Sequence, residues 1–206
     1  MTQLSDAKRA AILAAGTRMF LAAGYSAVSM DAIADAAPVS KPTLYNYFPG
    51  KQALFAAVVS DVCARMSAAV EMAERDAGDV RSDLEVIARA YVDIVYSPDC
   101  LALYRVIIAE LKNFPELGRL AYASGAIPII KAISRYLRGV DASAGVRFPR
   151  VDEAARVLMG LLSGDDFHRC LMGLSPTLTP RERGRLVKRV VDRFLRAHRN
   201  DDGADE

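Results

Sequence analysis

The chain has 206 residues, of which 52% are hydrophobic and 25% charged, and its formal net charge at pH 7 is +2. Such values are typical of an ordinary soluble globular protein with one or two domains. The small net charge does not by itself indicate a nucleic-acid partner, because these partners are recognised by concentrated basic patches.

The cysteines and the absence of long apolar runs indicate the cellular compartment. Cys63, Cys100 and Cys170 are odd in number and widely separated, which argues against a disulfide framework. No signal-length apolar segment follows the N-terminus, and no window approaches a membrane span. We therefore expect a cytoplasmic protein with no membrane partner.

The N-terminal region reads as three short helices. Apolar side chains recur at helical spacing over residues 5–23, and Gly24 supplies a left-handed stop. Ser29 can cap a second helix over residues 30–36, which Pro38 ends. After a tight connection, Ser40 can cap a third.

The remaining residues read as longer helices, and no strand pattern competes with them. A long helix is predicted from Lys51 to about Arg75, linking two regions. Further helices are predicted over residues 80–96, 100–113, 115–138 with a bend near Pro128, 151–173 and 180–198.

Residues 40–48 and Lys51 carry side chains suited to DNA. In a helix-turn-helix, the second helix lies in the major groove, so it needs a buried seam and a polar outer face. The predicted seam is Ile33, Ala34, Val39, Leu44 and Phe48. The predicted DNA-binding residues are Ser29, Ser40, Lys41, Pro42, Thr43, Tyr45, Asn46, Tyr47 and Lys51.

These residues divide by the contacts that their chemistry allows. Lys41 can donate to guanine acceptors, and Tyr45 can meet a thymine methyl group or a phosphate. The ring of Pro42 can touch a base, although it has no amide hydrogen to donate. The phosphate-contacting candidates are Ser29, Thr43, Asn46, Tyr47 and Lys51.

This segment resembles a known family. Residues 12–20, Gly24-Tyr25, residues 29–34 (Ser-Met-Asp-Ala-Ile-Ala) and residues 39–54 are similar to the N-terminal domain of the TetR family of bacterial transcriptional regulators. The resemblance implies a homodimer in which each N-terminal domain reads half of a palindromic operator, and it implies release by a small molecule. Pro38 departs from the family, which usually has Gly in the turn, and Pro42 stands where a small residue is common.

The second half is similar to the C-terminal domain of AefR-like proteins and multidrug-efflux repressors. The resemblance is carried by residues 103–110, 114–117 and 194–197. We accordingly expect an all-α protein with a three-helix helix-turn-helix DNA-binding domain over residues 1–51, the motif lying at about 29–48. The long helix would join it to a helical effector-binding and dimerisation domain over residues 52–206.

Two sets of apolar residues are candidates for binding in that second domain. Residues 181–199 are the most basic segment, but their apolar stripe predicts an amphipathic helix that packs on a partner. In the resembled family the last two helices form the dimer interface, which assigns to it Leu186, Val187, Val190, Val191 and Phe194. Aromatic candidates for a lipophilic effector pocket, with core packing as the alternative, are Tyr91, Tyr104, Phe114 and Tyr122.

The expected function is a ligand-responsive transcriptional repressor that binds a double-stranded DNA operator as a homodimer, with an unknown small-molecule effector and no cofactor. Catalysis is disfavoured because no phosphate loop, nucleophile elbow or zinc spacing is present. Two alternatives stay open. One is a helical small-molecule-binding or metal-dependent protein using Asp165 and His168. The other is a DNA-binding regulator switched by thiol oxidation.

Overall fold

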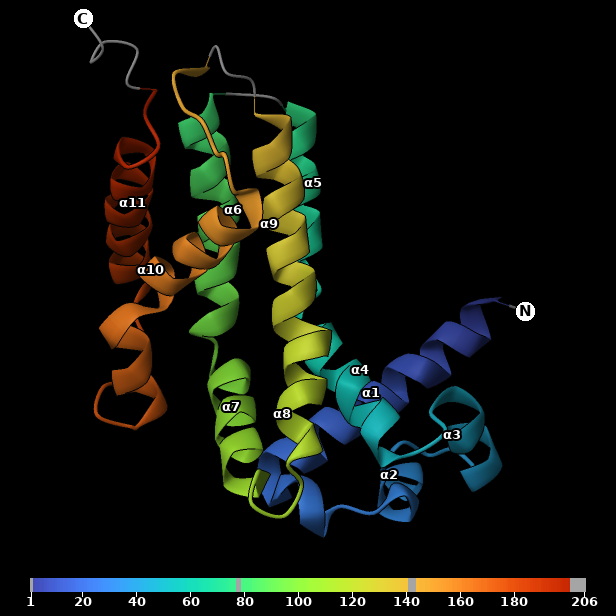
Figure 1. Cartoon of the computed structure of the whole chain (residues 1–206). Coiled ribbons are helices and arrows are strands. Elements are labelled where there is room, and N and C mark those ends of the chain that lie inside the picture. The colour runs from blue at the N-terminus through green and yellow to red at the C-terminus, as the bar shows by residue number, and fades with distance from the viewer. Residues whose placement is uncertain (1, 77–78, 141–143, 201–206) are drawn as a thin grey trace, which may run out of the picture. The chain divides into compact units, whose positions relative to one another are not determined.

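The computed structural model describes residues 2–76, 79–140 and 144–200, and it gives side chains for residues 6–64, 68–74, 79–140 and 144–200. The described chain is helical and contains no strand, which confirms the all-α prediction (Figure 1). The elements are α1 (Thr2–Ala27), α2 (Met30–Ala36), α3 (Lys41–Tyr47), α4 (Lys51–Cys63), α5 (Arg65–Asp76), α6 (Val80–Val95), α7 (Pro98–Glu110), α8 (Glu116–Ala121), the π-helix η1 (Tyr122–Ala126), α9 (Ile127–Gly139), α10 (Val151–Leu171) and α11 (Pro180–Arg196).

The chain forms two compact units, and neither is continuous in sequence. The first is Met1–Cys63 with Asp99–Ala126, and the second is Ala64–Pro98 with Ile127–Glu206. The first unit therefore contains the helix-turn-helix segment together with α4, most of α7, α8 and η1. These two units are defined by how the residues pack, which does not show which segments fold separately. The expected domain boundary after Lys51 therefore stays a prediction.

An aromatic cluster forms the centre of the first unit. The rings of Phe20, Tyr25 and Phe55 lie 5.2–5.8 Å apart, from centroid to centroid. Leu103 of α7 and Leu117 of α8 are buried in the same core. Helices α1 to α4 thus share their hydrophobic core with segments that follow much later in the chain.

Helix α6 is the centre of the second unit. Helices α5, α10 and α11 pack on it, and α9 packs on α5 and α10. Figure 1 shows α5, α6 and α9 running side by side. Helix α10 is interrupted at Gly164, where φ is 53° and ψ is −158°. The Tyr96 hydroxyl donates to the Ser163 carbonyl oxygen at 2.6 Å, so an acceptor freed by the interruption still has a donor.

The predicted continuous helix from Lys51 to Arg75 is wrong, because the chain turns at Ala64 and forms α4 and α5 instead. The two helices are buried in different cores. Leu54 and Val58 of α4 are buried in the first unit, and Val70 of α5 is buried in the second. Apolar spacing alone does not reveal this change of partner.

The predicted helix over residues 115–138 is divided into α8, η1 and α9. The π-helix ends two residues before Pro128, whose missing amide hydrogen and ring disturb the α-helical hydrogen bonds ahead of it. A Cβ atom on Gly125 would lie 3.1 Å from Val59 Cγ1, so η1 packs closely on α4. Within the described chain, no single helix has the length and apolar composition to cross a membrane, although α4 and residues 68–74 pass that test together.

Candidate nucleic-acid interface

The helix-turn-helix segment is defined by its caps and its turn. The Ser29 hydroxyl accepts a hydrogen bond from the Ala32 amide at 3.1 Å, as the predicted N-cap of α2. The Val39 amide donates to the Ala34 carbonyl at 3.0 Å across the turn. Ile33 and Ala34 are buried at the seam, which fixes α2 against its neighbours.

Helix α3 has seven residues, too few to be stable alone, and it is fixed from both ends. Ser40 caps it by accepting from the Thr43 amide at 3.3 Å. The Phe48 amide donates to the Leu44 carbonyl at 2.9 Å, and both of these side chains are buried. The predicted seam is confirmed at four positions, and Val39 is half-buried.

The outer face of α3 collects four of the residues predicted to contact DNA. Lys41, Pro42, Tyr45 and Asn46 are exposed, and their spacing places them on one side of the helix. Tyr45 is 47% exposed, although large aromatic side chains are usually buried. This short helix therefore presents a cation, an aromatic ring, an amide and the apolar ring of Pro42 together.

Thr43 and Tyr47 are half-buried at the edges of this face. The Thr43 hydroxyl lies 2.8 Å from the Ser40 hydroxyl, so one donates to the other. The Ser29 and Ser40 oxygens accept backbone hydrogen bonds, and each serine hydroxyl can also donate. The caps are thus compatible with phosphate contact at the same positions.

Lys41 has a partner that nothing in the sequence pattern indicates. Its ammonium group lies 2.6 Å from an Asp31 carboxylate oxygen, and both side chains are more than half exposed. The hydrogen bond to Asp31 raises the pKa of Lys41. A DNA contact by Lys41 would have to replace or share this carboxylate.

Lys51 packs against the end of α1. Its ammonium group donates to the Ser26 carbonyl at 3.2 Å and lies 4.5 Å from the centroid of the Tyr25 ring. Partial burial lowers the pKa of Lys51. Its contact with phosphate stays a prediction, and the structure adds a role in orienting the loop before α2.

Glu110 at the end of α7 is a site residue that the sequence analysis missed. One carboxylate oxygen accepts hydrogen bonds from the Ser26 amide at 2.8 Å and the Ser26 hydroxyl at 2.7 Å. These bonds lower the pKa of Glu110, which is buried. The partners lie 84 residues apart, so no local motif points to them.

The four predicted effector-binding aromatic residues are dispersed. Phe114 packs edge-on against Tyr25 at 5.2 Å, in the core of the first unit. Tyr104 and Tyr122 are exposed, while Tyr91 is buried in the second unit, where its hydroxyl lies 2.9 Å from the Ser163 hydroxyl. The cavities lined by residues of α5 and α6, of the start of α10, and of the segment around Val146 do not include any of the four.

The predicted dimer-interface stripe is buried within the chain itself. Helix α11 packs on α6 and α10. At most 5% of any of the five side chains is exposed: Leu186, Val187, Val190, Val191 and Phe194. In this arrangement they belong to the core of the second unit, and their role in a dimer interface stays a prediction.

The residues behind the two alternative functions have structural partners. His168 Nδ1 lies 2.8 Å from the Gly164 carbonyl oxygen, beside the interruption in α10. In the described chain, no three His, Cys, Asp or Glu residues are grouped to hold a metal. Burial raises the pKa of Cys63 to about 11 and that of Cys100 to about 12, so neither is a ready thiolate.

Two family models match the chain. Residues 12–58 match the model described as bacterial regulatory proteins, tetR family. Residues 82–200 match the C-terminal domain of the AefR-like transcriptional repressors. Together they cover the helix-turn-helix segment and most of the later helices.

A curated relative matches part of the chain. The HTH-type transcriptional activator FasR of Mycolicibacterium smegmatis is 37% identical over 90 residues, which are 44% of this chain and 41% of FasR. The match therefore spans less than half of the length of that relative.

Solved structures match over nearly the whole chain. The flavonoid-responsive regulator FrrA is 34% identical, with a TM-score of 0.69 over 94% of this chain and 97% of FrrA. A protein of Mesorhizobium loti MAFF303099, described as a TetR-family transcriptional regulator, is 26% identical, with a TM-score of 0.80 over 97% of this chain and 100% of its own.

Proposed function

Because the chain belongs to the TetR family of bacterial transcriptional regulators, we propose that it is a ligand-responsive repressor that binds a palindromic operator as a homodimer. Membership makes it a DNA-binding transcriptional regulator and not an enzyme. The observation that carries the proposal is the outer face of α3, where Lys41, Pro42 and Tyr45 are exposed on a capped and anchored helix.

In the proposed complex α3 enters the major groove. Lys41, Pro42 and Tyr45 contact base edges, while Ser29, Thr43, Asn46, Tyr47 and Lys51 fix the register on phosphates. Two such helices in a dimer would bind adjacent major grooves about 34–36 Å apart, or a multiple of that spacing.

Genomic fragments selected with the purified protein would supply the operator for a binding test. Tyr45→Ala and Lys41→Ala should each weaken operator binding by a factor equivalent to about 1–3 kcal/mol and relax the preference for the selected sequence. Lys112→Ala removes an equally exposed lysine after α7 and serves as the charge-matched control. Unchanged affinity in a Tyr45→Ala, Lys41→Ala double variant would refute α3 as the reader.

The repressor direction is supported by the description of the family model that covers residues 82–200. FasR, in contrast, is an activator, and it matches over only part of its length. A reporter transcribed from the selected operator measures the direction. Expression of the reporter should fall when the protein is supplied. A rise in expression would show that the protein is an activator.

We propose that the homodimer uses exposed apolar side chains on α10 and the loop after it. Leu161, Met172 and Leu174 are 38%, 70% and 69% exposed, whereas single soluble chains usually cover such groups. Leu161→Glu with Met172→Glu should shift the sedimentation coefficient from dimer to monomer. Met72→Glu changes an exposed methionine on α5 and should leave the dimer intact.

The effector is proposed to be small and lipophilic. A cavity of about 590 Å³ in the second unit is lined mainly by apolar atoms of α5, α6 and Val187, and this volume suits a drug-sized ligand. Such an effector would release DNA by preferring a conformation in which the two reading helices are misplaced. Compounds that lower operator binding should also shift the melting temperature of the free protein, because they bind without DNA.

A further inference from the structure

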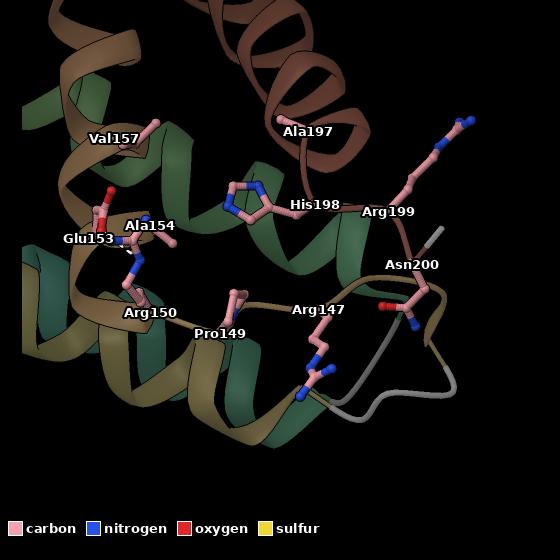
Figure 2. Close-up of a pocket in the computed structure, with 10 residues that line it drawn as sticks. All are labelled: Arg147, Pro149, Arg150, Glu153, Ala154, Val157, Ala197, His198, Arg199 and Asn200. Atoms are coloured by element: carbon pink, nitrogen blue, oxygen red, sulfur yellow. Dashed lines mark ion pairs between the residues drawn. The ribbon is translucent and has the colours of Figure 1, made fainter. Parts of the chain in front are cut away.

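We propose that a second cavity, lined by Arg147, Arg150, His198 and Arg199, binds a small organic anion: a carboxylate or phosphate attached to an apolar body. Its volume is about 520 Å³, within the range of small-molecule sites. The lining comes from the loop before α10, the first turns of α10 and the segment after α11, all in the second unit (Figure 2).

The charges around this cavity favour an anion. Arg150 is paired with Glu153 at 3.0 Å, and these two charges offset each other. Arg147 and Arg199 also line the cavity, and among the described residues neither has an ion-pair partner. Arginine recognises carboxylates and phosphates through two parallel N–H donors, which suits both groups of the proposed ligand class.

The start of α10 adds to this field. Arg150 is its N-cap residue, and no side chain caps the helix there. The first amide groups of a helix lack internal acceptors and lie at the positive end of the helix dipole. Because Arg150, Glu153 and Ala154 of this first turn line the cavity, the positive end of the helix dipole lies beside the arginines.

The cavity also has an apolar side. Figure 2 shows Val157 and Ala154 on α10, across the cavity from the segment that carries Ala197 and His198. Val157 is 45% exposed. An apolar body attached to the anion would cover this side chain, which gives an organic anion an advantage over an inorganic one.

Contacts behind the lining hold His198 in place before any ligand arrives. Its Nδ1 atom lies 2.8 Å from the Phe194 carbonyl oxygen, and its ring lies 4.9 Å from that of buried Phe148. Since a carbonyl only accepts, Nδ1 donates in this contact, which fixes the orientation of the ring at the edge of the cavity. The Arg147 amide donates to the His198 carbonyl at 2.8 Å, which ties the two cationic segments together.

The test uses His198 as a reporter at the site itself. The chain has two histidines, so a His168→Gln variant leaves a single imidazole whose nuclear magnetic resonance signals are assigned without ambiguity. Phenyl phosphate, benzoate, inorganic phosphate and uncharged benzyl alcohol are titrated against the full chain. The same titrations are made on a chain ending at Asn200, because four acidic residues follow and could compete.

Phenyl phosphate or benzoate should shift the His198 signals saturably, benzyl alcohol should not, and inorganic phosphate should bind at least about ten-fold more weakly. Arg147→Gln with Arg199→Gln should weaken binding about ten-fold or more. Lys188→Gln with Arg193→Gln removes the same charge from exposed positions on α11 and should leave binding unchanged.

Three results would overturn the proposal: no saturable shift in either chain, binding that survives in the double arginine variant, or equal binding of inorganic phosphate, which would mark an adventitious ion only. The outcome is independent of DNA, so it does not depend on whether α3 proves to be the reading helix.

Discussion

At the scale of single residues, the ammonium group of Lys41 has two competing anions. In the free chain it is paired with Asp31, and in the proposed complex it would contact DNA. The pair is exposed, and exposed pairs contribute little to stability, so exchange of partners is cheap. The carboxylate nevertheless takes a donor of Lys41 that a phosphate or a guanine edge would need, and its charge opposes the approach of any polyanion.

Asp31→Asn should therefore strengthen binding to DNA of any sequence several-fold at low salt, and it should steepen the salt dependence by up to about one unit of slope. Asp35→Asn makes the same change of charge on the same helix, but it leaves the hydrogen bond between Lys41 and Asp31 in place. Fluorescence anisotropy at several salt concentrations compares the two. Equal gains in both variants would mean that net charge matters and the pairing does not.

Glu110 is expected to stabilise the first unit in a pH-dependent way. Its folded-state pKa is lowered by two hydrogen bonds from Ser26, so its stabilisation is present above the unfolded-state pKa and is lost as the pH falls through the folded-state value. Glu110→Gln should lower the free energy of unfolding by about 1–2 kcal/mol at pH 7.

The difference between Glu110→Gln and the wild type should shrink as the pH is lowered through the acidic range, because the wild-type carboxylate becomes protonated. Urea unfolding followed by circular dichroism measures it. Glu116→Gln is the control, since its carboxylate bonds only the exposed Gln52 side chain at 3.2 Å among the hydrogen bonds described. A pH-independent difference would show that the lost contact is steric rather than electrostatic.

At the scale of elements, the turn between α2 and α3 places a proline in a backbone conformation that its ring disfavours. Pro38 has a φ of 22°, whereas the proline ring favours about −65°. The backbone there follows a path that suits glycine, which the resembled family usually has at this position. By contrast, Pro42 lies in the first turn of α3, where its ring matches the helical backbone.

Pro38→Gly should raise the free energy of unfolding by about 1 kcal/mol, as relief of backbone strain outweighs the greater freedom of the unfolded chain. Pro42→Gly should lower it, because the proline there is already favourable. Thermal and urea unfolding of the two variants give the comparison. A loss of stability in both would show that the turn tolerates Pro38 without strain.

The elements near the N-terminus were predictable because their signals are local. Ser29 and Ser40 stand immediately before helical segments, Ser40 with Pro42 in the first turn, and the structure has both helices with these caps. The break at Ala64 was not predictable, since the apolar spacing continues while the packing partner changes. The burial of the α11 stripe was foreseen as packing, but the sequence cannot distinguish a partner in the same chain from one in a second copy.

For the candidate site, the side chains on α3 could be named from residue type and helical spacing, and their exposure agrees. Their partners could not. Asp31 and Glu110 act through contacts between elements, and a single sequence contains no pairing signal for them. The cavity lined by Arg147 and Arg199 could not be predicted for the same reason. The two residues lie 52 positions apart in the sequence, and only the fold brings them to one cavity.

At the scale of the whole molecule, the first unit is assembled from two separate stretches of chain. Leu103, Ile107 and Leu117 are buried in its core, although they follow the segment Ala64–Pro98 that belongs to the second unit. The helix-turn-helix segment therefore depends for its packing on residues outside the first part of the chain.

A chain ending at Cys63 should accordingly be much less stable than the same segment in the full protein. It lacks three large buried aliphatic side chains, and removal of even one such contact costs about 2–5 kcal/mol. Circular dichroism and amide hydrogen exchange of the truncated chain test this. A cooperative, protected fold in residues 1–63 would show that the remaining helices are dispensable for the core.

The same interleaving affects how the protein is made. When Cys63 leaves the ribosome, Leu117 has not yet been synthesised, and translation at about 5–20 residues per second delays it by several seconds. Throughout that interval the apolar faces of α1 and α4 lack part of their partners. The helix-turn-helix segment is therefore translated first but completed only after most of α8 has emerged. A nascent chain stalled before that point would be a substrate for chaperones rather than a folded DNA-binding unit.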